Sequence, residues 1–166
     1  FKFATMLKDS EKLGTGTITI KNDFRVTRVG KILRKTKINE LPQIFNILLG
    51  HISIVGPRPL LVESFNSYPR NIRDKIYDSK PGLTGIGSII FRDEESIISS
   101  NNKYDPHVFY KKYISPYKGE LELWYHSKKS FFIDLLLILI TVWVIIFPKS
   151  KIYNSVFKLP KSKIKF

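Results

Sequence analysis

The sequence TKINELPQIFNILLGHISIVGPRP, at residues 36–59, organises the rest of the chain. Its first half predicts a helix, because apolar residues recur there at helical spacing and form one face: Leu41, Ile44, Phe45, Leu48 and Leu49. Asn39 is the expected N-cap, and Pro42 comes early enough in the helix to be tolerated. Gly50 is the expected stop, since glycine readily adopts the left-handed conformation that ends helices.

A short strand and a rigid turn complete this stretch. Residues 52–55, Ile-Ser-Ile-Val, predict a buried strand. Residues 56–59, Gly-Pro-Arg-Pro, predict a turn in which two proline rings restrict the backbone on both sides of Arg58. An arginine held in this way is a candidate for contact with a diphosphate or a sugar, or alternatively for bonding backbone carbonyls.

Cations collect at the start of the predicted helix. Residues 25–37 carry six lysines and arginines, and Glu40 follows in the first turn. The free amides and the dipole of a helix N-terminus favour anions. Cations and amides suit phosphate oxygens, and a carboxylate suits Mg²⁺, so the arrangement fits a metal–diphosphate ligand. The residues alone equally allow an ordinary helix with a solvated basic face.

The composition restricts the class of protein. A chain of 166 residues predicts one domain, and 43% hydrophobic residues argue against disorder. The net charge of +14 indicates a polyanionic partner: nucleic acid, anionic lipid headgroups or a phosphorylated substrate. The absence of cysteine from the sequence excludes disulfides and thiolate chemistry. The three histidines show no zinc-site spacing.

Further elements are expected along the chain. The pattern predicts a short strand at Thr17–Lys21, a helix beginning within 60–68, a basic amphipathic segment at 70–77, a glycine-rich strand at 83–91, a polar loop at 96–107 and a helix at 120–129.

Residues 131–147 form an apolar run of seventeen residues with one charge, Asp134. That length is at the lower limit for a spanning helix, so a core helix, a transmembrane span and an interfacial helix all remain open. The lysines on both sides and Trp143 favour contact with an anionic leaflet. The expected organisation is a domain at residues 1–147 followed by a basic C-terminal tail at 148–166.

The central stretch resembles the signature of the bacterial sugar transferases, the monotopic phosphoglycosyl transferases. The matching segments keep the family's order and spacing, and the resemblance covers residues 2–147. They are Arg25–Gly30, Leu33–Thr36, Glu40–Gln43, Asn46, Gly50, Ser53–Leu60 and Lys80–Gly85.

The resemblance implies a single membrane-associated, monotopic α+β domain, mainly helical with short strands, with an N-terminal membrane helix preceding Phe1. It implies transfer of a sugar-1-phosphate from a nucleotide-diphosphate sugar, usually a UDP-sugar, to undecaprenyl phosphate. Such a reaction initiates the assembly of a surface polysaccharide, lipopolysaccharide or glycoprotein glycan. The implied location is the cytoplasmic face of the bacterial inner membrane, and a homo-oligomer is left open.

The resemblance also implies roles for individual residues. The family's catalytic pair is Asp-Glu, in which the aspartate attacks phosphorus and the glutamate helps to hold Mg²⁺. Here Glu40 matches the glutamate and Asn39 stands at the position of the nucleophile. Arg34, Arg58 and Arg92 match arginines expected to bind substrate.

Asn39 leaves three explanations open, because a neutral amide is a poor nucleophile. A carboxylate at 93–95 attacks in its place, or transfer is direct with Glu40 holding the metal, or the chain is an inactive membrane scaffold. A basic nucleic-acid-binding module is a further alternative. No helix-turn-helix, RNP or zinc-finger pattern supports that alternative, and it gives no role to residues 131–147.

Overall fold

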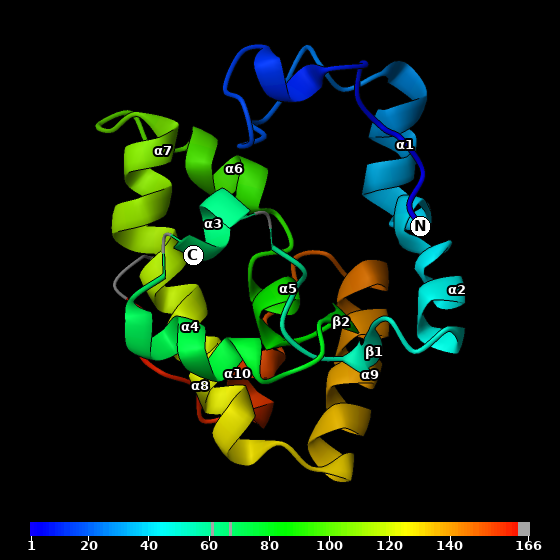
Figure 1. Ribbon diagram of the computed structural model, residues 1–166, viewed down its shortest axis with the longest axis vertical. Helices are drawn as coiled ribbons and strands as arrows, with labels where there is room; N and C mark the ends of the chain where they lie inside the picture. Colours follow the sequence, from blue (N-terminus) through cyan, green and yellow to red (C-terminus); the bar gives the residue numbers. More distant parts are fainter. Residues whose placement is uncertain (61, 67, 163–166) are drawn as a thin grey trace.

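The computed structural model describes residues 1–60, 62–66 and 68–162. Its elements, in chain order, are η1 Ser10–Lys12, α1 Arg28–Thr36, η2 Ile38–Glu40, α2 Gln43–Leu48, β1 Ser53–Val55, α3 Val62–Asn66, α4 Arg70–Tyr77, β2 Gly82–Thr84, α5 Ile86–Ile90, α6 Glu94–Ser99, α7 Pro106–Phe109, the π-helix η3 Tyr110–Ile114, α8 Ser115–Lys128, α9 Phe131–Ile146 and α10 Tyr153–Val156 (Figure 1). The mainly helical fold with short strands that the sequence predicts is confirmed.

The two strands form a small parallel sheet. Ser53 of β1 lies opposite Gly82 of β2, and Val55 lies opposite Thr84. The strand expected at 52–55 is therefore confirmed, although Ile54 faces outward and is exposed. The strands approach so closely that a Cβ on Gly82 would lie 2.1 Å from the backbone nitrogen of Gly56, which only glycine permits. This contact fixes the start of the turn that carries Arg58.

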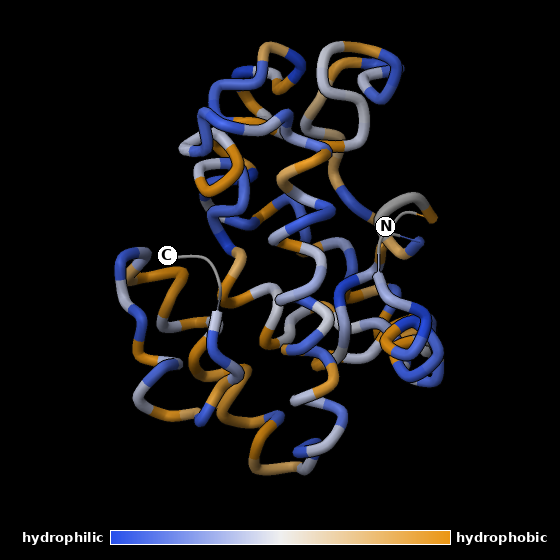
Figure 2. The backbone as a smooth tube through the Cα atoms, turned by 90° about the vertical axis from the view of Figure 1, so that its left-hand side faces the viewer, coloured by the Kyte–Doolittle hydropathy of each residue, from blue (hydrophilic) through white to orange (hydrophobic). Residues whose placement is uncertain are grey.

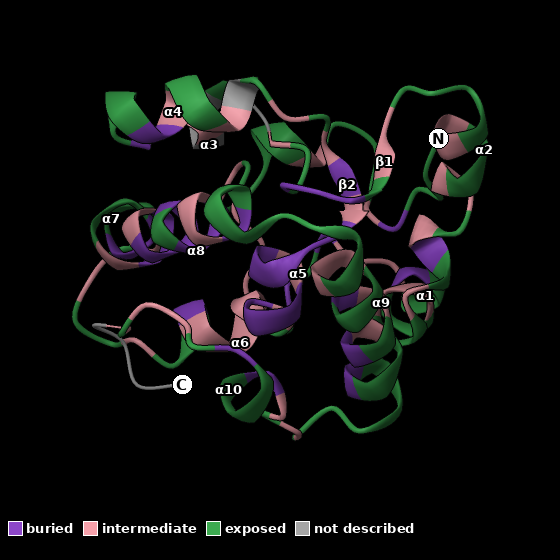
Figure 3. Cartoon of the chain, turned by 90° about the horizontal axis from the view of Figure 1, so that it is seen from below, coloured by how far each residue is buried: buried purple, intermediate pink, exposed green. Residues whose placement is uncertain are grey.

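The core lies where α5, α8 and α9 meet. Ile86, Ile114, Leu121 and Leu137 are fully buried there, and purple, buried segments mark α5 and the inner sides of α8 and α9 in Figure 3. The segment after residue 147 also contributes, because two of its aromatic side chains, Tyr153 and Phe157, join the same core. Hydrophobic residues are not confined to this core: they occur along the whole height of the molecule (Figure 2).

Helix α9 confirms the helix expected from the apolar run. Leu137, Ile140 and Val144 face the core, whereas the opposite side of the helix is exposed. Its two polar side chains are paired: Asp134 accepts a hydrogen bond from Tyr125 at 2.7 Å, and Thr141 contacts Thr84 of β2 at 2.7 Å. Within the described ranges, no helix is both long and apolar enough to cross a bilayer.

Helix α2 differs from the prediction at its start. It begins at Gln43 rather than after Asn39, and Asn39 lies in the preceding 3-10 turn, where its side chain caps nothing. The reason is local: Lys37 adopts a left-handed conformation that ends α1, and the chain needs η2 to turn into α2. Gly50, with φ of 72°, confirms the expected stop. The predicted apolar face is formed, but it lies on the surface: Leu41, Ile44, Phe45, Leu48 and Leu49 are all exposed.

The glycine-rich strand expected at 83–91 is wrong beyond Thr84, because α5 begins at Ile86. Ile86, Ile89 and Ile90 recur at helical spacing and are all buried, so the core favours a helix here. The strand expected at Thr17–Lys21 is also wrong. The carbonyls of Gly16 and Ile18 accept hydrogen bonds from the Arg25 guanidinium instead of from a neighbouring strand.

Two helices occupy parts of the loop expected at 96–107. Glu94 and Glu95 place negative charge in the first turn of α6, which favours a helix start. Asp105 caps α7 by accepting from the backbone nitrogens of His107 and Val108. The expected helix at 120–129 is present but begins earlier, at Ser115, because the π-helix η3 continues α7 directly into α8.

Candidate active site

Asn39 is held inside the junction between α1 and α2. It is 4% exposed, and its backbone carbonyl accepts a hydrogen bond from Phe3 N at 3.1 Å. Its Oδ1 atom is buried and has no hydrogen-bond partner among the described residues. A buried carbonyl oxygen without a partner is uncommon in proteins and costs free energy. The site therefore offers one buried oxygen that the described residues leave without a partner.

Glu40 lies beside Asn39 and is surrounded by cations. Its Oε1 accepts from Lys2 Nζ at 3.1 Å and from Arg58 Nη2 at 3.3 Å, and its side chain is 16% exposed. Burial alone would raise the pKa of Glu40, but Arg58, Lys2 and Lys37 together hold that pKa below its ordinary value. Glu40 is thus an ionised carboxylate at neutral pH. The contact between Arg58 and Glu40, 18 positions apart, brings the Gly-Pro-Arg-Pro turn to the start of the signature stretch.

Lys37 adds a third cation to this group. Burial lowers its pKa, Glu40 raises it, and the positive charges of Arg58, Arg92 and Lys2 lower it further. A cation kept among other cations gains most from an added anion, because the anion offsets both the repulsion and the lost hydration. Lys37 therefore marks this region as a place for a negatively charged ligand.

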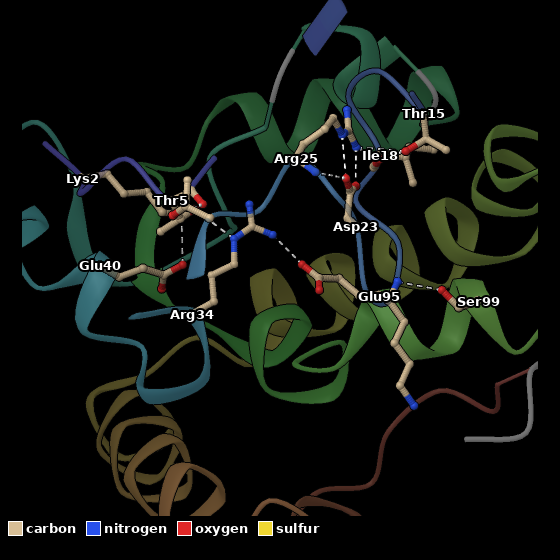
Figure 4. Close-up of polar contacts among 12 residues, drawn as sticks. Lys2, Thr5, Thr15, Ile18, Asp23, Arg25, Arg34, Glu40, Glu95 and Ser99 are labelled. Atoms are coloured by element: carbon tan, nitrogen blue, oxygen red, sulfur yellow. Dashed lines mark hydrogen bonds and ion pairs between the residues drawn. The ribbon is translucent and has the colours of Figure 1, made fainter. Parts of the chain in front are cut away.

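Arg34 makes a different set of contacts from those of Arg58. It donates through Nε to Thr5 Oγ1 at 2.9 Å and through Nη1 to Glu95 Oε1 at 2.6 Å (Figure 4). It thereby connects α1 with the N-terminal segment and with α6. Because it is only partly buried, it can still reach a ligand in the space between these elements.

A large cavity of about 1260 Å³ lies between these elements. Lysines and arginines outnumber acidic residues on its walls, and those walls include Lys2, Lys37, Arg34, Arg58 and Arg92. Asn39 and Glu40 are not wall residues; the two cations that pair with Glu40 stand on the wall instead. The structure thus brings the predicted arginines to one cavity, with the acidic residue beside it.

Arg92 follows α5 on the cavity wall. Its Nε atom is buried and has no hydrogen-bond partner in the part of the chain that the structure describes. Burial lowers the pKa of Arg92, and Asp93 opposes that effect. A buried guanidinium nitrogen with a free donor suits an acceptor oxygen brought by a ligand.

The alternative carboxylates of residues 93–95 also lie on the cavity wall. Glu94 pairs with Lys118 at 2.5 Å, and Glu95 pairs with Arg34. Asp93 precedes α6, and its side chain makes no capping hydrogen bond. All three are near enough to the cavity to remain candidates for a relocated nucleophile.

Several site residues were missed by sequence reasoning. In the N-terminal segment, Lys2 contacts Glu40 and Thr5 contacts Arg34. No local sequence pattern predicts contacts between residues so far apart in the chain. Arg25, 1% exposed, forms a buried ion pair with Asp23 at 2.6 Å and also binds carbonyls of residues 10–18 (Figure 4). The pairing of Arg25 with an aspartate two residues earlier was a visible signal. Its role is to shape the loop beside the cavity.

Two oxygen-bearing side chains beside the cavity are of the type that binds a magnesium ion. No cluster of three acidic or histidine side chains suited to a metal occurs within the described residues. Mg²⁺, however, commonly uses one or two protein oxygens together with substrate phosphates and water. Glu40 supplies an ionised carboxylate, and Asn39 Oδ1 supplies a buried oxygen that lacks a partner.

Comparison with known proteins identifies a bacterial sugar transferase. Residues 1–148 match the family model for bacterial sugar transferases, and the chain belongs to that family. The chain is 34% identical over 142 residues to the uncharacterized sugar transferase EpsL of Bacillus subtilis, covering 86% of this chain and 59% of EpsL. It is 35% identical over 146 residues to the UDP-glucose:undecaprenyl-phosphate glucose-1-phosphate transferase of Klebsiella pneumoniae, covering 86% of this chain and 28% of that protein.

A third relative is the undecaprenyl-phosphate galactose phosphotransferase of Salmonella typhimurium. It is 38% identical over 91 residues, which cover 55% of this chain and 17% of that protein. The chain therefore spans less than two thirds of the length of each of these relatives.

Proposed function

We propose that this protein transfers a sugar-1-phosphate from a UDP-sugar to undecaprenyl phosphate, and so initiates assembly of a surface glycan. The observation that carries the proposal is the pairing of Glu40 with Lys2 and Arg58 at the edge of a cation-lined cavity. The relatives support the same reaction, since two of them are named as undecaprenyl-phosphate sugar phosphotransferases.

The cations are the groups we expect to bind the donor's diphosphate. Lys2 and Arg58 each bond Glu40 by a single contact, and Lys37 stands beside them. A diphosphate gives these side chains several oxygens, and charge-assisted hydrogen bonds to phosphate are strong. Arg34 and Arg92 on the same cavity extend this surface toward the nucleotide.

Glu40 and Asn39 are the residues we expect to hold Mg²⁺. When bound, Mg²⁺ neutralises charge on the diphosphate. Binding of the diphosphate draws Lys2 and Arg58 toward its oxygens, which leaves the Glu40 carboxylate available as a ligand. The side chain of Asn39 needs no proton loss to bind a cation through its amide oxygen.

For the transfer itself we favour direct attack. The lipid phosphate oxygen attacks the phosphorus next to the sugar, a new P–O bond forms, and the bond to UMP breaks with its electron pair leaving on UMP. Asn39 is neutral, and Glu94 and Glu95 are both ion-paired, so within the described residues Asp93 is the one carboxylate of the three candidates without an ion pair. Direct transfer requires no such residue.

The membrane contact is proposed to involve α1, α2 and α9, which lie along one side of the molecule (Figures 1 and 3). All three carry exposed large apolar residues: Val29 and Ile32 on α1, the face of α2, and Phe131, Phe132, Leu139 and Ile146 on α9. An exposed apolar area of this extent indicates an interaction surface. The net charge of +14 favours the anionic cytoplasmic leaflet of the inner membrane as the partner.

The reaction is tested by UMP release. Membranes containing the complete gene product are supplied with undecaprenyl phosphate, Mg²⁺ and UDP-glucose, UDP-galactose or UDP-N-acetylgalactosamine in turn. We expect one or more donors to be converted, chelation to stop the reaction, and Glu40→Gln to abolish it while Glu11→Gln, an exposed acidic control, retains it. Donor binding without turnover would instead support the inactive scaffold.

A further inference from the structure

The cavity has a second polar region, formed by α5 and α8, that the phosphate chemistry does not use. Glu122 of α8 is 7% exposed, and its Oε2 has no hydrogen-bond partner among the described residues. Ser88 of α5 has a buried Oγ that also lacks one. Both residues stand on the wall of the large cavity. Buried polar atoms without partners are rare, so two on one wall, both unpartnered among the described residues, mark this wall as a candidate ligand site.

The surroundings of Glu122 are built to accommodate its carboxyl group. A Cβ on Gly87 would lie 2.7 Å from Glu122 Oε1, so the glycine leaves the space that this oxygen needs. Lys118, one helical turn away, is paired with Glu94 and lies 5.2 Å above the ring of Tyr110. Lys118 is therefore already engaged, and it makes no hydrogen bond to Glu122 within the described residues. Burial raises the pKa of Glu122 to about 7, although Lys118 opposes this rise.

The Pro57–Arg58 turn connects this region with Glu40. Pro57 shares the wall of a small adjoining cavity with Glu122 and also lines the large one. The next residue, Arg58, extends to Glu40. Two adjacent residues of one turn therefore contact the Glu122 region and the cation cluster. Arg58 lines the same cavity as Ser88 of α5 and Glu122 of α8.

We propose that Glu122 and Ser88 bind hydroxyl groups of the donor's sugar and so determine which sugar is accepted. This inference rests on the proposed function and names the end of the cavity that selects the sugar. A carboxyl group accepts hydrogen bonds from adjacent hydroxyls, and a serine hydroxyl both donates and accepts. A phosphate would be a poor ligand here above about pH 7, where the Glu122 carboxyl group is ionised and repels it.

The test separates sugar binding from nucleotide binding. Calorimetric affinities for UMP, UDP-glucose, UDP-galactose and UDP-N-acetylgalactosamine are measured with Mg²⁺ on native protein, Glu122→Gln and Ser88→Ala. We expect both variants to weaken binding of the preferred UDP-sugar about 10- to 100-fold, as for loss of a buried hydrogen bond, with UMP changed less than about twofold. Glu120→Gln, an exposed change on the same helix, should alter neither affinity.

Other outcomes overturn the inference. Equal losses for UMP and UDP-sugar would assign the region to the nucleotide, and unchanged affinities in both variants would exclude it from the site. If Glu122→Gln does not fold, as judged by thermal unfolding, Ser88→Ala alone decides. Failure of the proposed function has a different signature, because native protein would then bind donors without releasing UMP in the lipid assay, or bind none of them.

Discussion

The Asn39 side chain is buried beside an ionised Glu40, and this placement changes what a substitution there should do. If Asn39 were a helix cap, aspartate would replace it at little cost, since both residues cap well. It is not a cap, so the carboxylate introduced by Asn39→Asp would be buried next to a like charge. The cations around Glu40 offset only part of that repulsion.

We therefore expect Asn39→Asp to lower stability by roughly 1–3 kcal/mol, the usual cost of burying a polar group without full compensation. The same change supplies a carboxylate at the position of the family's nucleophile. Brief exposure to donor without acceptor should then give a phosphosugar adduct on residue 39, detected by mass spectrometry. Native protein should give none; an adduct on Asp93, Glu94 or Glu95 in the native chain would refute direct transfer.

Glu122 gives a prediction about pH. Its pKa is about 7 in the folded protein, against an ordinary value of 4.5. Between these values the unfolded chain has lost the proton while the folded chain keeps it, so stability falls as pH rises toward 7. Each pKa unit corresponds to about 1.4 kcal/mol, so the cost at pH 8 is on the order of 3 kcal/mol. Glu122→Gln should raise the melting temperature at pH 8 and leave it nearly unchanged at pH 4.

An unaltered melting temperature at both pH values would show that Glu122 is solvated in the folded protein. Glu120→Gln provides the control, because that side chain is exposed on the same helix and should show no pH-dependent gain.

Among the elements, α9 and β1 could be predicted because their sequences specify them locally. The apolar run of α9 is long and carries a single charge, and β1 lies between Gly50 and Gly56. The short segment that becomes α5 fits a strand or a helix equally well, and only packing against α8 and α9 decides. The strand predicted at Thr17–Lys21 does not form, because the Arg25 guanidinium donates a hydrogen bond to the backbone carbonyl of Ile18.

The site was predictable to a similar extent. Glu40 and Arg58 were recognisable within the signature stretch, and the structure pairs them. Lys2, Thr5 and Glu122 were not identified, because each acquires its role from a contact with an element distant in sequence.

Substitutions on the buried face and on the exposed face of α9 should have different effects. Leu137 and Ile140 are in the core, so Leu137→Lys and Ile140→Lys would unfold the protein and report nothing about membranes. Leu139 and Ile146 are exposed. Leu139→Lys with Ile146→Lys should keep the melting temperature close to native, since surface changes usually cost within about 0.5 kcal/mol each.

The same double variant should lose binding to anionic vesicles in a flotation assay, because charged side chains are costly in the apolar part of a bilayer. A folded double variant that floats as well as native protein would exclude α9 from the membrane contact. Lys substitution on α2, at Phe45 and Leu48, tests the other exposed face by the same measurement.

At the scale of the whole molecule, two kinds of surface are separated. Lysines and arginines predominate around the cavity, where a diphosphate would bind, while exposed apolar residues follow α1, α2 and α9 along one side. The ion pair between Arg34 and Glu95 connects α1 with α6 at the cavity. The fold therefore places the cation-lined cavity near an apolar surface, which suits the proposed reaction between a soluble donor and a lipid acceptor.

This separation predicts how the protein responds to salt. Electrostatic attraction to anionic lipid contributes about 1 kcal/mol per lysine or arginine near the surface, and it is lost when screening becomes strong. Burial of apolar side chains in the bilayer is not screened. At about 1 M salt, where the screening length is about 3 Å, we expect binding to anionic vesicles to weaken but persist, and binding to neutral vesicles to remain unchanged. A nucleic-acid-binding module would behave differently, because counterion release makes its affinity fall steeply with salt. Complete release from membranes at high salt, with the apolar faces intact, would refute the membrane contact and restore that alternative.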